Sequence, residues 1–235
     1  MTKTMLVTGA SKGIGQATVE RFWAGENDID TFVLLARNST EFDELREHLT
    51  ANNPGGKRFF HHEIDLNDLD AIRDLLPQIM AEAGRVDYLV NNAGFTAPSP
   101  IHEVRFSDFE RTMNVNLYAP FVITQGLLHA GNRFEFILNV ASTAGINGRS
   151  GWLTYSASKA AMIAMSSVMK EELSIYGTRV VTISPGRCAT ALRRTLAPDE
   201  DPSTIMQPED VAGVIEMLAS DFGKFVDSQN LVVRL

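Results

Sequence analysis

Short apolar runs alternate along the chain with longer stretches in which apolar residues recur every three or four positions. The short runs have the length of β-strands, and the longer stretches have the length of amphipathic helices. This alternation is typical of β-α-β units, which build a parallel sheet. Seven runs are expected to form strands, and they cover residues 4–8, 31–36, 58–64, 86–90, 134–140, 179–184 and 231–234.

The amphipathic stretches between these runs predict the helices. Asn67 is expected to cap one of them, and Ser107 with Glu110 three residues later has the pattern of a capping box. The main helices are expected at residues 13–25, 39–49, from 67, 107–128, 154–176 and from 208. The pattern therefore predicts an α/β fold: a doubly wound parallel β-sheet of about seven strands flanked by helices, forming a single domain over residues 1–235.

Composition narrows the class of protein. The 235 residues are 44% hydrophobic, which suits one substantial core. A net charge of −8, from 21 basic and 29 acidic residues, argues against binding to nucleic acid or to an acidic membrane surface. Cys188 is the single cysteine, and neither a secretion signal nor an apolar run of about 20 residues is present, so a cytoplasmic protein is expected.

The first expected strand leads into a turn with three glycines, Gly9, Gly13 and Gly15. Glycine lets the backbone turn tightly and approach a pyrophosphate closely, and the N-terminus of the next helix offers free N–H groups to it. The spacing differs from the common Gly-x-Gly-x-x-Gly fingerprint. Its position at the first strand-to-helix turn nevertheless predicts dinucleotide binding.

The end of the second expected strand bears on which dinucleotide is bound. Enzymes specific for NAD usually place an acidic residue about 20 residues beyond the glycines, where it holds the ribose 2′-hydroxyl. Ala36 occupies that position here, Arg37 follows it, and Lys12 lies inside the glycine turn. Two cations without an acid suit a 2′-phosphate and predict NADP(H); the alternative is that both are solvated surface charges.

Tyr155 and Lys159 lie four residues apart on an expected helix and therefore share one of its faces. A tyrosine and a lysine at this spacing often occur by chance, so the pair alone does not indicate a function. The preceding expected strand, however, ends at Ser142, so a hydroxyl and the tyrosine–lysine pair can converge at the edge of the sheet.

With these motifs, the chain resembles the single-domain short-chain dehydrogenases/reductases over roughly residues 4–190. The resemblance implies one NAD(P)-binding Rossmann domain. The motifs that carry it are the turn 8–15, Asn91-Asn92-Ala93-Gly94, Asn116 within 114–117, Ser142, Tyr155 with Lys159, and Pro185-Gly186 followed by Thr190.

The resemblance implies catalytic roles for four residues. Tyr155 would be the acid in reduction and the base in oxidation, although a free tyrosine has a pKa of about 10. The Lys159 ammonium would favour the phenolate and would also hold the nicotinamide ribose. Ser142 would donate a hydrogen bond to the substrate oxygen, and Asn116 would position a water for proton relay.

The resemblance also implies a set of cofactor contacts. Asp65 would meet the adenine amine, Ile14 would pack beneath the nicotinamide, and the segment from Pro185 would surround its carboxamide. The full expected set is Gly9, Ser11, Lys12, Gly13, Ile14, Gly15, Arg37, Asp65, Leu66, Asn91, Ala93, Gly94, Tyr155, Lys159, Pro185, Gly186 and Thr190.

A loop at about 189–207 is expected to cover the substrate. Its part 197–203 lacks apolar periodicity and is either a mobile lid or a plain solvated loop. Arg193 and Arg194 suit either a phosphate on an acyl carrier or plain solvation. His61 and His62 have no spaced partners, so no metal site is expected.

The leading functional hypothesis is a reductase that uses NADPH and acts on a small molecule with a ketone or β-ketoacyl group. The alternatives are an alcohol dehydrogenase working in the oxidative direction and a non-catalytic NADP(H) sensor. The resemblance implies a homodimer or homotetramer, with dimerisation through the helices 107–128 and 154–176. The tail 227–235 lacks the family's usual Asp-Gly-Gly ending, which puts the tetramer in doubt.

Overall fold

The computed structural model describes residues 2–226 and 229–235. Within that part of the chain, seven parallel strands form one sheet in the order β3-β2-β1-β4-β5-β6-β7. The strands are β1 (Lys3–Thr8), β2 (Ile29–Ala36), β3 (Arg58–Glu63), β4 (Tyr88–Asn91), β5 (Phe136–Val140), β6 (Arg179–Pro185) and β7 (Leu231–Val233). The predicted fold class, a doubly wound parallel sheet, is confirmed.

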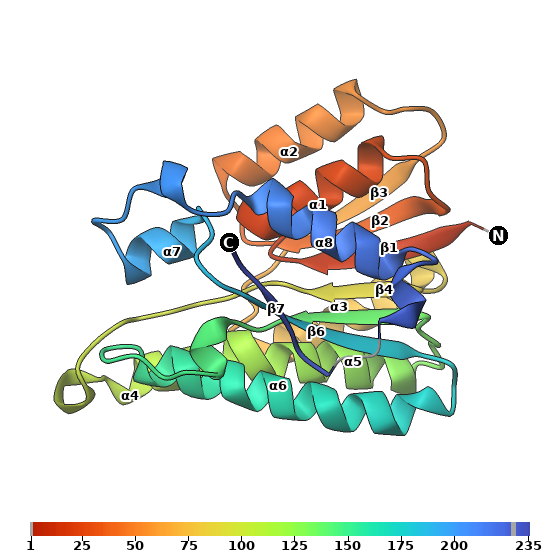
Figure 1. The fold of residues 1–235 in the computed structure, drawn as a ribbon. Coiled ribbons are helices and arrows are strands. Elements are labelled where there is room, and N and C mark those ends of the chain that lie inside the picture. The colour runs from red at the N-terminus through yellow and green to blue at the C-terminus, as the bar shows by residue number, and fades with distance from the viewer. Residues whose placement is uncertain (1, 227–228) are drawn as a thin grey trace.

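Helices cover both faces of this sheet. They are α1 (Gly13–Ala24), α2 (Thr40–Ala51), α3 (Leu69–Ala83), α4 (Phe106–Met113), α5 (Ala119–His129), α6 (Leu153–Ser174), α7 (Ala191–Leu196) and α8 (Pro208–Ala219). Figure 1 shows α1, α2 and α8 on one face and α3, α5 and α6 on the other, while α7 lies beyond one end of the strands.

The side chains of alternate strand residues point to opposite faces of the sheet and pack into two separate hydrophobic cores. Met5 and Val7 of β1 belong to the core under α1, α2 and α8, whereas Leu6 between them belongs to the core under α3 and α5. Phe32 and Val33 of β2 are divided in the same way. Because both faces are covered, nearly every strand position is apolar, which explains why continuous runs predicted these strands well.

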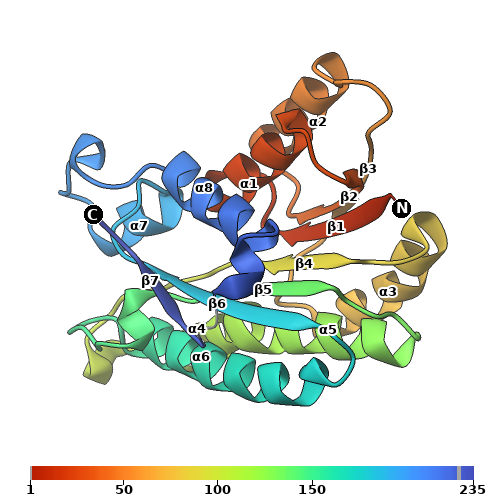
Figure 2. The ribbon, with the colours of Figure 1, turned by 45° about the vertical axis from the view of Figure 1, so that its right-hand side comes forward.

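The order of the strands creates a crevice beside β1. The chain moves outward from β1 to β2 and β3, then returns to β4 on the other side of β1. The connections after β1 and β4 therefore diverge at the carboxyl ends of these strands, where doubly wound sheets bind ligands. Figures 1 and 2 place α7 at this end of the sheet and the N-terminus at the opposite end.

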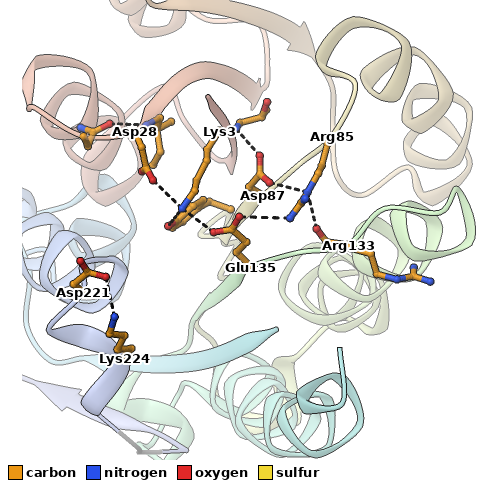
Figure 3. A network of polar contacts seen from close by, with 12 residues as sticks. Lys3, Asp28, Arg85, Asp87, Arg133, Glu135, Asp221 and Lys224 are labelled. Atoms are coloured by element: carbon orange, nitrogen blue, oxygen red, sulfur yellow. Dashed lines mark hydrogen bonds and ion pairs between the residues drawn. The ribbon is translucent and has the colours of Figure 1, made fainter. Parts of the chain in front are cut away.

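Ion pairs tie the strands together at that opposite end (Figure 3). The Lys3 ammonium lies 2.8 Å from Asp28 and 2.7 Å from Glu135. The Asp87 carboxylate accepts from the Thr4 amide at 2.9 Å and pairs with Arg85 at 2.7 Å. Burial lowers the pKa of Lys3, but the hydrogen bonds with Asp28 and Glu135 outweigh it and raise that pKa overall. The network links β1 to the segments that open β2, β4 and β5.

Two predicted helix caps are wrong. Asp68, not Asn67, caps α3, and its carboxylate accepts from the amides of Asp70 and Ala71 at 3.2 and 2.9 Å. The chain enters α4 at Phe106, one residue earlier than expected, so Ser107 already lies in the first turn and cannot cap it.

The expected continuous helix at 107–128 contains a π-helical turn at Asn114–Tyr118. The Ala119 amide bonds to the Asn114 carbonyl, five residues back. Such turns are rare and often mark functional sites. The turn separates α4 from α5 and contains Asn116.

Candidate active site

A cavity of about 1100 Å³ opens at the carboxyl ends of the strands. It is lined by the connections that follow the strands β1 to β6 and by residues of α7. The predicted site residues that line it are Gly9, Ser11, Lys12, Gly13, Ile14, Arg37, Asp65, Leu66, Ala93, Gly94, Ser142, Tyr155, Lys159, Pro185, Gly186 and Thr190. Gly15, Asn91 and Asn116 lie outside this lining.

The turn between β1 and α1 needs its glycines for two different reasons. Gly9 and Gly13 have φ angles of 65° and 59°, in the left-handed region that favours glycine. Gly15 has no room for a side chain, because a Cβ there would lie 2.2 Å from the Gly9 carbonyl oxygen. Lys12 at the N-cap of α1 makes no side-chain cap, so the first amides of this helix are left for a ligand.

Thr8 and Asn92 hold this turn against the end of β4. The Thr8 hydroxyl accepts from the amides of Asn92 and Ala93 at 3.0 and 3.1 Å. The Asn92 side chain donates to the carbonyls of Thr8 and Gly9 at 3.0 and 3.2 Å. The sequence analysis noted both residues only as parts of motifs and missed their role in fixing the turn.

An acidic side chain, Glu41, lies beside one of the two cations that were expected to bind a 2′-phosphate. Arg37 lines the cavity directly after β2, as predicted. The Lys12 ammonium, however, lies 3.3 Å from the Glu41 carboxylate in the first turn of α2. Hydrogen bonds from the Glu41 backbone, the Ser39 side chain and Lys12 lower the pKa of Glu41, so this carboxylate is ionised.

Ser142, Tyr155 and Lys159 come together where β5 ends. The Lys159 ammonium donates to the Val140 carbonyl at 2.7 Å and lies 5.9 Å from the centre of the Tyr155 ring. Both side chains are buried, with 3% of Lys159 and 6% of Tyr155 exposed. An ammonium has three donors, and the other two of Lys159 have no partner among the described residues.

Burial controls the charge of both groups. Burial lowers the pKa of Lys159 to about 8. Burial raises the pKa of the Tyr155 phenol, while a hydrogen bond with Ser142 and the positive charge of Arg193 act in the lowering direction. The phenol is therefore the neutral, proton-donating form near neutral pH. The sequence analysis expected the Lys159 charge to act on Tyr155 and did not foresee the Arg193 charge.

The amide of Asn116 is fully engaged away from the cavity. Its nitrogen donates to the Ser158 hydroxyl at 2.9 Å and to the Phe95 carbonyl at 3.0 Å, and its oxygen accepts from the Phe95 amide at 2.7 Å. These bonds fasten the π-helical turn to α6 and to the connection after β4. A role in positioning water stays a prediction, and with these bonds it would fall to the backbone of this turn.

Asn91 also points into the protein. It is buried and donates to the Asn139 side chain at 2.8 Å, and Asn139 donates to the Ser166 hydroxyl at 2.8 Å. This chain joins β4, β5 and α6 just behind the site. Asn91 and Gly15 therefore shape the cavity from behind its surface.

Trp152 and two arginines line the same cavity as Tyr155. The guanidinium carbons of Arg149 and Arg193 lie 5.7 and 5.6 Å from the centre of the Trp152 ring. Arg193 is on α7, within the expected substrate loop 189–207. Within the segment 197–203, Glu200 pairs with Arg193 and Asp201 caps a short turn at Pro202–Thr204, and both a mobile lid and a solvated loop stay predictions.

Three further observations concern the thiol, the metal ligands and the helices. Burial raises the pKa of the Cys188 thiol to about 12, so this thiol is not an activated nucleophile. Over residues 2–226 and 229–235, no three histidine, cysteine or acidic side chains lie together as metal ligands. None of the helices in the described residues is both long and apolar enough to cross a membrane.

Comparisons with known proteins agree with this architecture. A family model described as short chain dehydrogenase matches residues 3–201. A 3-oxoacyl-(acyl-carrier-protein) reductase from Thermotoga maritima is 32% identical over 238 residues, covering 97% of this chain and 94% of its own.

Solved structures are similar over the same length. A blue fluorescent protein from a metagenomic library, in complex with NADPH, has a TM-score of 0.85 and 30% identity and covers 98% of this chain and 96% of its own. A 4-hydroxyisoleucine dehydrogenase complexed with NADH has a TM-score of 0.84 and 26% identity, with the same coverage.

The family model spans most of the chain, and the relatives match it from end to end. The fold, the glycine turn and the serine, tyrosine and lysine at the end of β5 are what the motifs of the sequence implied. The chain therefore belongs to the short-chain dehydrogenase/reductase family of oxidoreductases.

Proposed function

We propose that this protein is an NADP(H)-dependent reductase that acts on a small molecule with a ketone or β-ketoacyl group. The observation that carries the proposal is the placement of Ser142, Tyr155 and Lys159 in the same cavity as the glycine turn of β1 and α1. One end of the cavity thus suits a dinucleotide phosphate, and the other suits proton transfer to a carbonyl. Alcohol oxidation is the same reaction reversed, and its direction follows the cofactor supply.

Three features of the structure support a bound dinucleotide. A Cβ at Gly9 would lie 2.9 Å from the Ala93 Cα, so this turn accepts only a bare backbone beside a pyrophosphate. The uncapped amides of α1 face the same space. Lys159 has two donors left for a ribose hydroxyl.

The choice of NADP(H) over NAD(H) rests on the cations. Arg37 and Lys12 both line the cavity at the end of β2, where a ribose 2′-phosphate would lie. The similar structures hold NADPH in one case and NADH in another, so the family alone does not decide the cofactor. Glu41 weakens the contribution of Lys12, which makes Arg37 the main determinant.

When bound, the nicotinamide supplies the hydride for the carbonyl carbon. The Tyr155 hydroxyl, neutral near pH 7, donates its proton to the carbonyl oxygen. The Ser142 hydroxyl donates a second hydrogen bond to that oxygen and stabilises the charge that develops on it. The Lys159 ammonium, fixed by the Val140 carbonyl, holds the ribose and stabilises the phenolate that remains.

The substrate class follows from the relatives. The 3-oxoacyl-(acyl-carrier-protein) reductase that matches 97% of this chain supports a β-ketoacyl group as one candidate substrate. Partly apolar walls from Phe95, Trp152 and Leu192 suit a short carbon chain beside the ketone. The expected cytoplasmic location rests on the single cysteine and stays a prediction.

We expect Tyr155→Phe to lower kcat/KM for ketone reduction by at least about a hundredfold, because the proton donor is lost. NADPH binding should survive, since the phenol oxygen is not needed for the phosphate contacts. NADPH oxidation is measured with a panel of small ketones, aromatic aldehydes and a β-ketoacyl thioester. Tyr176→Phe, at an exposed tyrosine, is the matched control.

The outcomes of this experiment separate the candidate functions. Turnover that survives Tyr155→Phe would show that the acid–base assignment is wrong. Tight NADPH binding by the wild type without turnover of any carbonyl would instead favour a non-catalytic sensor.

We expect kcat/KM for NADPH to fall above about pH 8 in the reductive direction, where Lys159 loses its charge. The sign follows from the lysine being positive below its pKa and neutral above it. The pH profile of kcat/KM reports the pKa values of groups in the free enzyme. Loss of charge on one such group lowers kcat/KM by about tenfold per pH unit above its pKa. In Lys159→Arg the charge persists to about pH 12, so any remaining activity should lose this decline. A wild-type profile that is flat to pH 10 would contradict the assignment.

We expect Arg37→Gln to weaken NADPH binding by about tenfold while leaving NADH binding nearly unchanged, because a charge-assisted contact to the 2′-phosphate is lost. Both affinities are measured by titration of the cofactor's fluorescence. Arg73→Gln, on the exposed surface of α3, serves as the control. Equal weakening of both cofactors would mean that Arg37 does not select between them.

We also propose a homodimer through α4, α5 and α6, the expected helices. Exposed apolar side chains there include Phe106, Phe121 and Val168, at 72%, 45% and 55% exposure. A second set of exposed apolar residues consists of Phe222 and Phe225, which follow α8, and Val232 within β7, and it suits a further contact that would make a tetramer.

Light scattering should therefore give at least twice the 25.9 kDa mass of the chain. Phe121→Asp should lower that mass, because it puts a charge into the apolar contact. The mass of a single chain for the wild type would exclude both assemblies.

A further inference from the structure

The cavity is positive although the protein is acidic. Among the described residues, eight of the 21 basic side chains line it, against one of the 29 acidic side chains, Asp65. The basic lining residues are Lys12, Arg37, Arg111, Arg149, Lys159, Arg187, Arg193 and Arg234. A concentration of one sign of charge in a cleft raises the local concentration of ligands of the other sign.

The proposed cofactor accounts for only part of this charge. Lys12 in the turn after β1 and Arg37 after β2 would meet its phosphates, and Lys159 would meet its ribose. Arg111 is 3.5 Å from Asp65, which offsets its charge. Arg149 and Arg193 lie at the other end of the cavity, over the Trp152 ring. Trp152 precedes Tyr155 by three residues in the chain. The nicotinamide brings no phosphate to this end.

Arg193 is held in place by Glu200, but this carboxylate does not neutralise all of the positive charge around it. Its Nε and Nη2 donate to Glu200 at 2.6 and 2.8 Å, and the same carboxylate lies 3.4 Å from Arg187. Two guanidinium groups thus share one carboxylate. Nη1 of Arg193 has no hydrogen-bond partner among the described residues, and Glu200 lies outside the lining of the cavity.

Arg149 adds a second cation at the same place. It is exposed, lines the cavity and forms no ion pair with any described residue. Its guanidinium shares the Trp152 ring with that of Arg193. Two guanidinium groups beside one aromatic ring, with one carboxylate behind them, form a site that suits an anion.

This site lies in the same cavity as Tyr155, and Trp152 stands three residues before Tyr155 at the start of α6. The charge of Arg193 acts on the Tyr155 phenol and lowers its pKa against the effect of burial. An anion held by Arg193 would therefore lie near the carbonyl that Tyr155 protonates, and not at the remote end of a long carrier arm.

We propose that Arg193, assisted by Arg149, is a specificity-determining residue that binds an anionic group of the substrate near its ketone. This inference rests on the proposed reductase function and narrows it to ketones that carry a carboxylate or a phosphate. The carboxylate accepts from Nη1 of Arg193 and from Arg149, while Glu200 keeps the Arg193 side chain in position. Because Arg193 lines the same cavity as Tyr155, a carboxylate belonging to the ketone itself is favoured.

The rival explanation is purely structural. Glu200 would then fasten α7 to the segment after it through Arg193, and the anion would be absent. Loss of Arg193 would in that case loosen α7 and slow every substrate alike. The two explanations therefore differ in how a charged and a neutral substrate respond.

The test compares NADPH-dependent reduction of levulinate, a keto carboxylate, with that of its neutral methyl ester. We expect the wild type to prefer levulinate. Arg193→Met, which keeps the length and packing of the side chain, should lower kcat/KM for levulinate by about tenfold to a hundredfold relative to the ester. Arg194→Met is the matched control, because this neighbouring arginine does not line the cavity. Equal loss for both substrates, or no preference in the wild type, would overturn the proposal.

A second variant should increase the preference for levulinate over its ester. Glu200→Gln keeps an amide oxygen that can accept from Nε or Nη2 of Arg193 but removes the negative charge beside the site, so the ratio of levulinate to ester should rise. A ratio that stays at or falls below the wild-type value would support the structural explanation instead.

Binding without turnover separates this inference from the reductase function. Trp152 is one of two tryptophans, and Trp23 is buried in the core, so fluorescence changes on adding levulinate report the site. Levulinate binding that is lost in Arg193→Met would support the anion site even if no ketone were reduced. Absence of levulinate binding and of levulinate preference in the wild type would refute it.

A final comparison identifies the source of the anion. Acetoacetyl pantetheine is compared with its phosphorylated form in the wild type and in Arg193→Met. Sensitivity to Arg193 only with the phosphorylated form would assign the anion to a carrier phosphate, whereas sensitivity only with levulinate would assign it to the substrate's carboxylate.

Discussion

The hydrogen bond from the buried Lys159 ammonium to the Val140 carbonyl joins helix α6 to the end of strand β5. The rest of the site depends on it, because it fixes the face of α6 that carries Tyr155 beside Ser142. Burying an ammonium with a single protein partner is costly, and burial accordingly lowers its pKa to about 8. A site that keeps such a group is built around something that completes its hydrogen bonds.

Much of this architecture could be predicted from the sequence, since buried parallel strands are apolar on both faces and glycine turns have few alternatives. Most strand ends were predicted to within two residues, and the glycine turn with Ser142, Tyr155 and Lys159 lines one cavity. What could not be predicted depends on contacts between distant residues. Glu41 beside Lys12 and Glu200 beside Arg193 look like ordinary surface acids in the sequence. The π-helical turn at Asn114–Tyr118 likewise has no sequence signal known to us.

Charge is distributed unevenly over this molecule. A net charge of −8 coexists with a cavity lined by eight cations and one acid among the described residues. The net negative charge repels polyanions such as nucleic acid, while the positive cavity attracts small anions that fit inside it. The positive potential of the cavity would attract both the dinucleotide and an anionic substrate. Binding of the negatively charged dinucleotide would therefore partly neutralise the attraction for the substrate.

The ion-pair network around Lys3, Asp87 and Glu135 (Figure 3) lies at the amino ends of the strands, whereas the cavity opens at their carboxyl ends. The anchoring of the sheet and the chemistry of the loops are thereby placed at opposite ends of one scaffold. Mutations in α7 and its neighbouring segment can then alter substrate choice without weakening the framework that holds the strands in register. This separation gives a lineage of such proteins freedom to explore new substrates by changing a few loop residues, while selection for folding acts elsewhere.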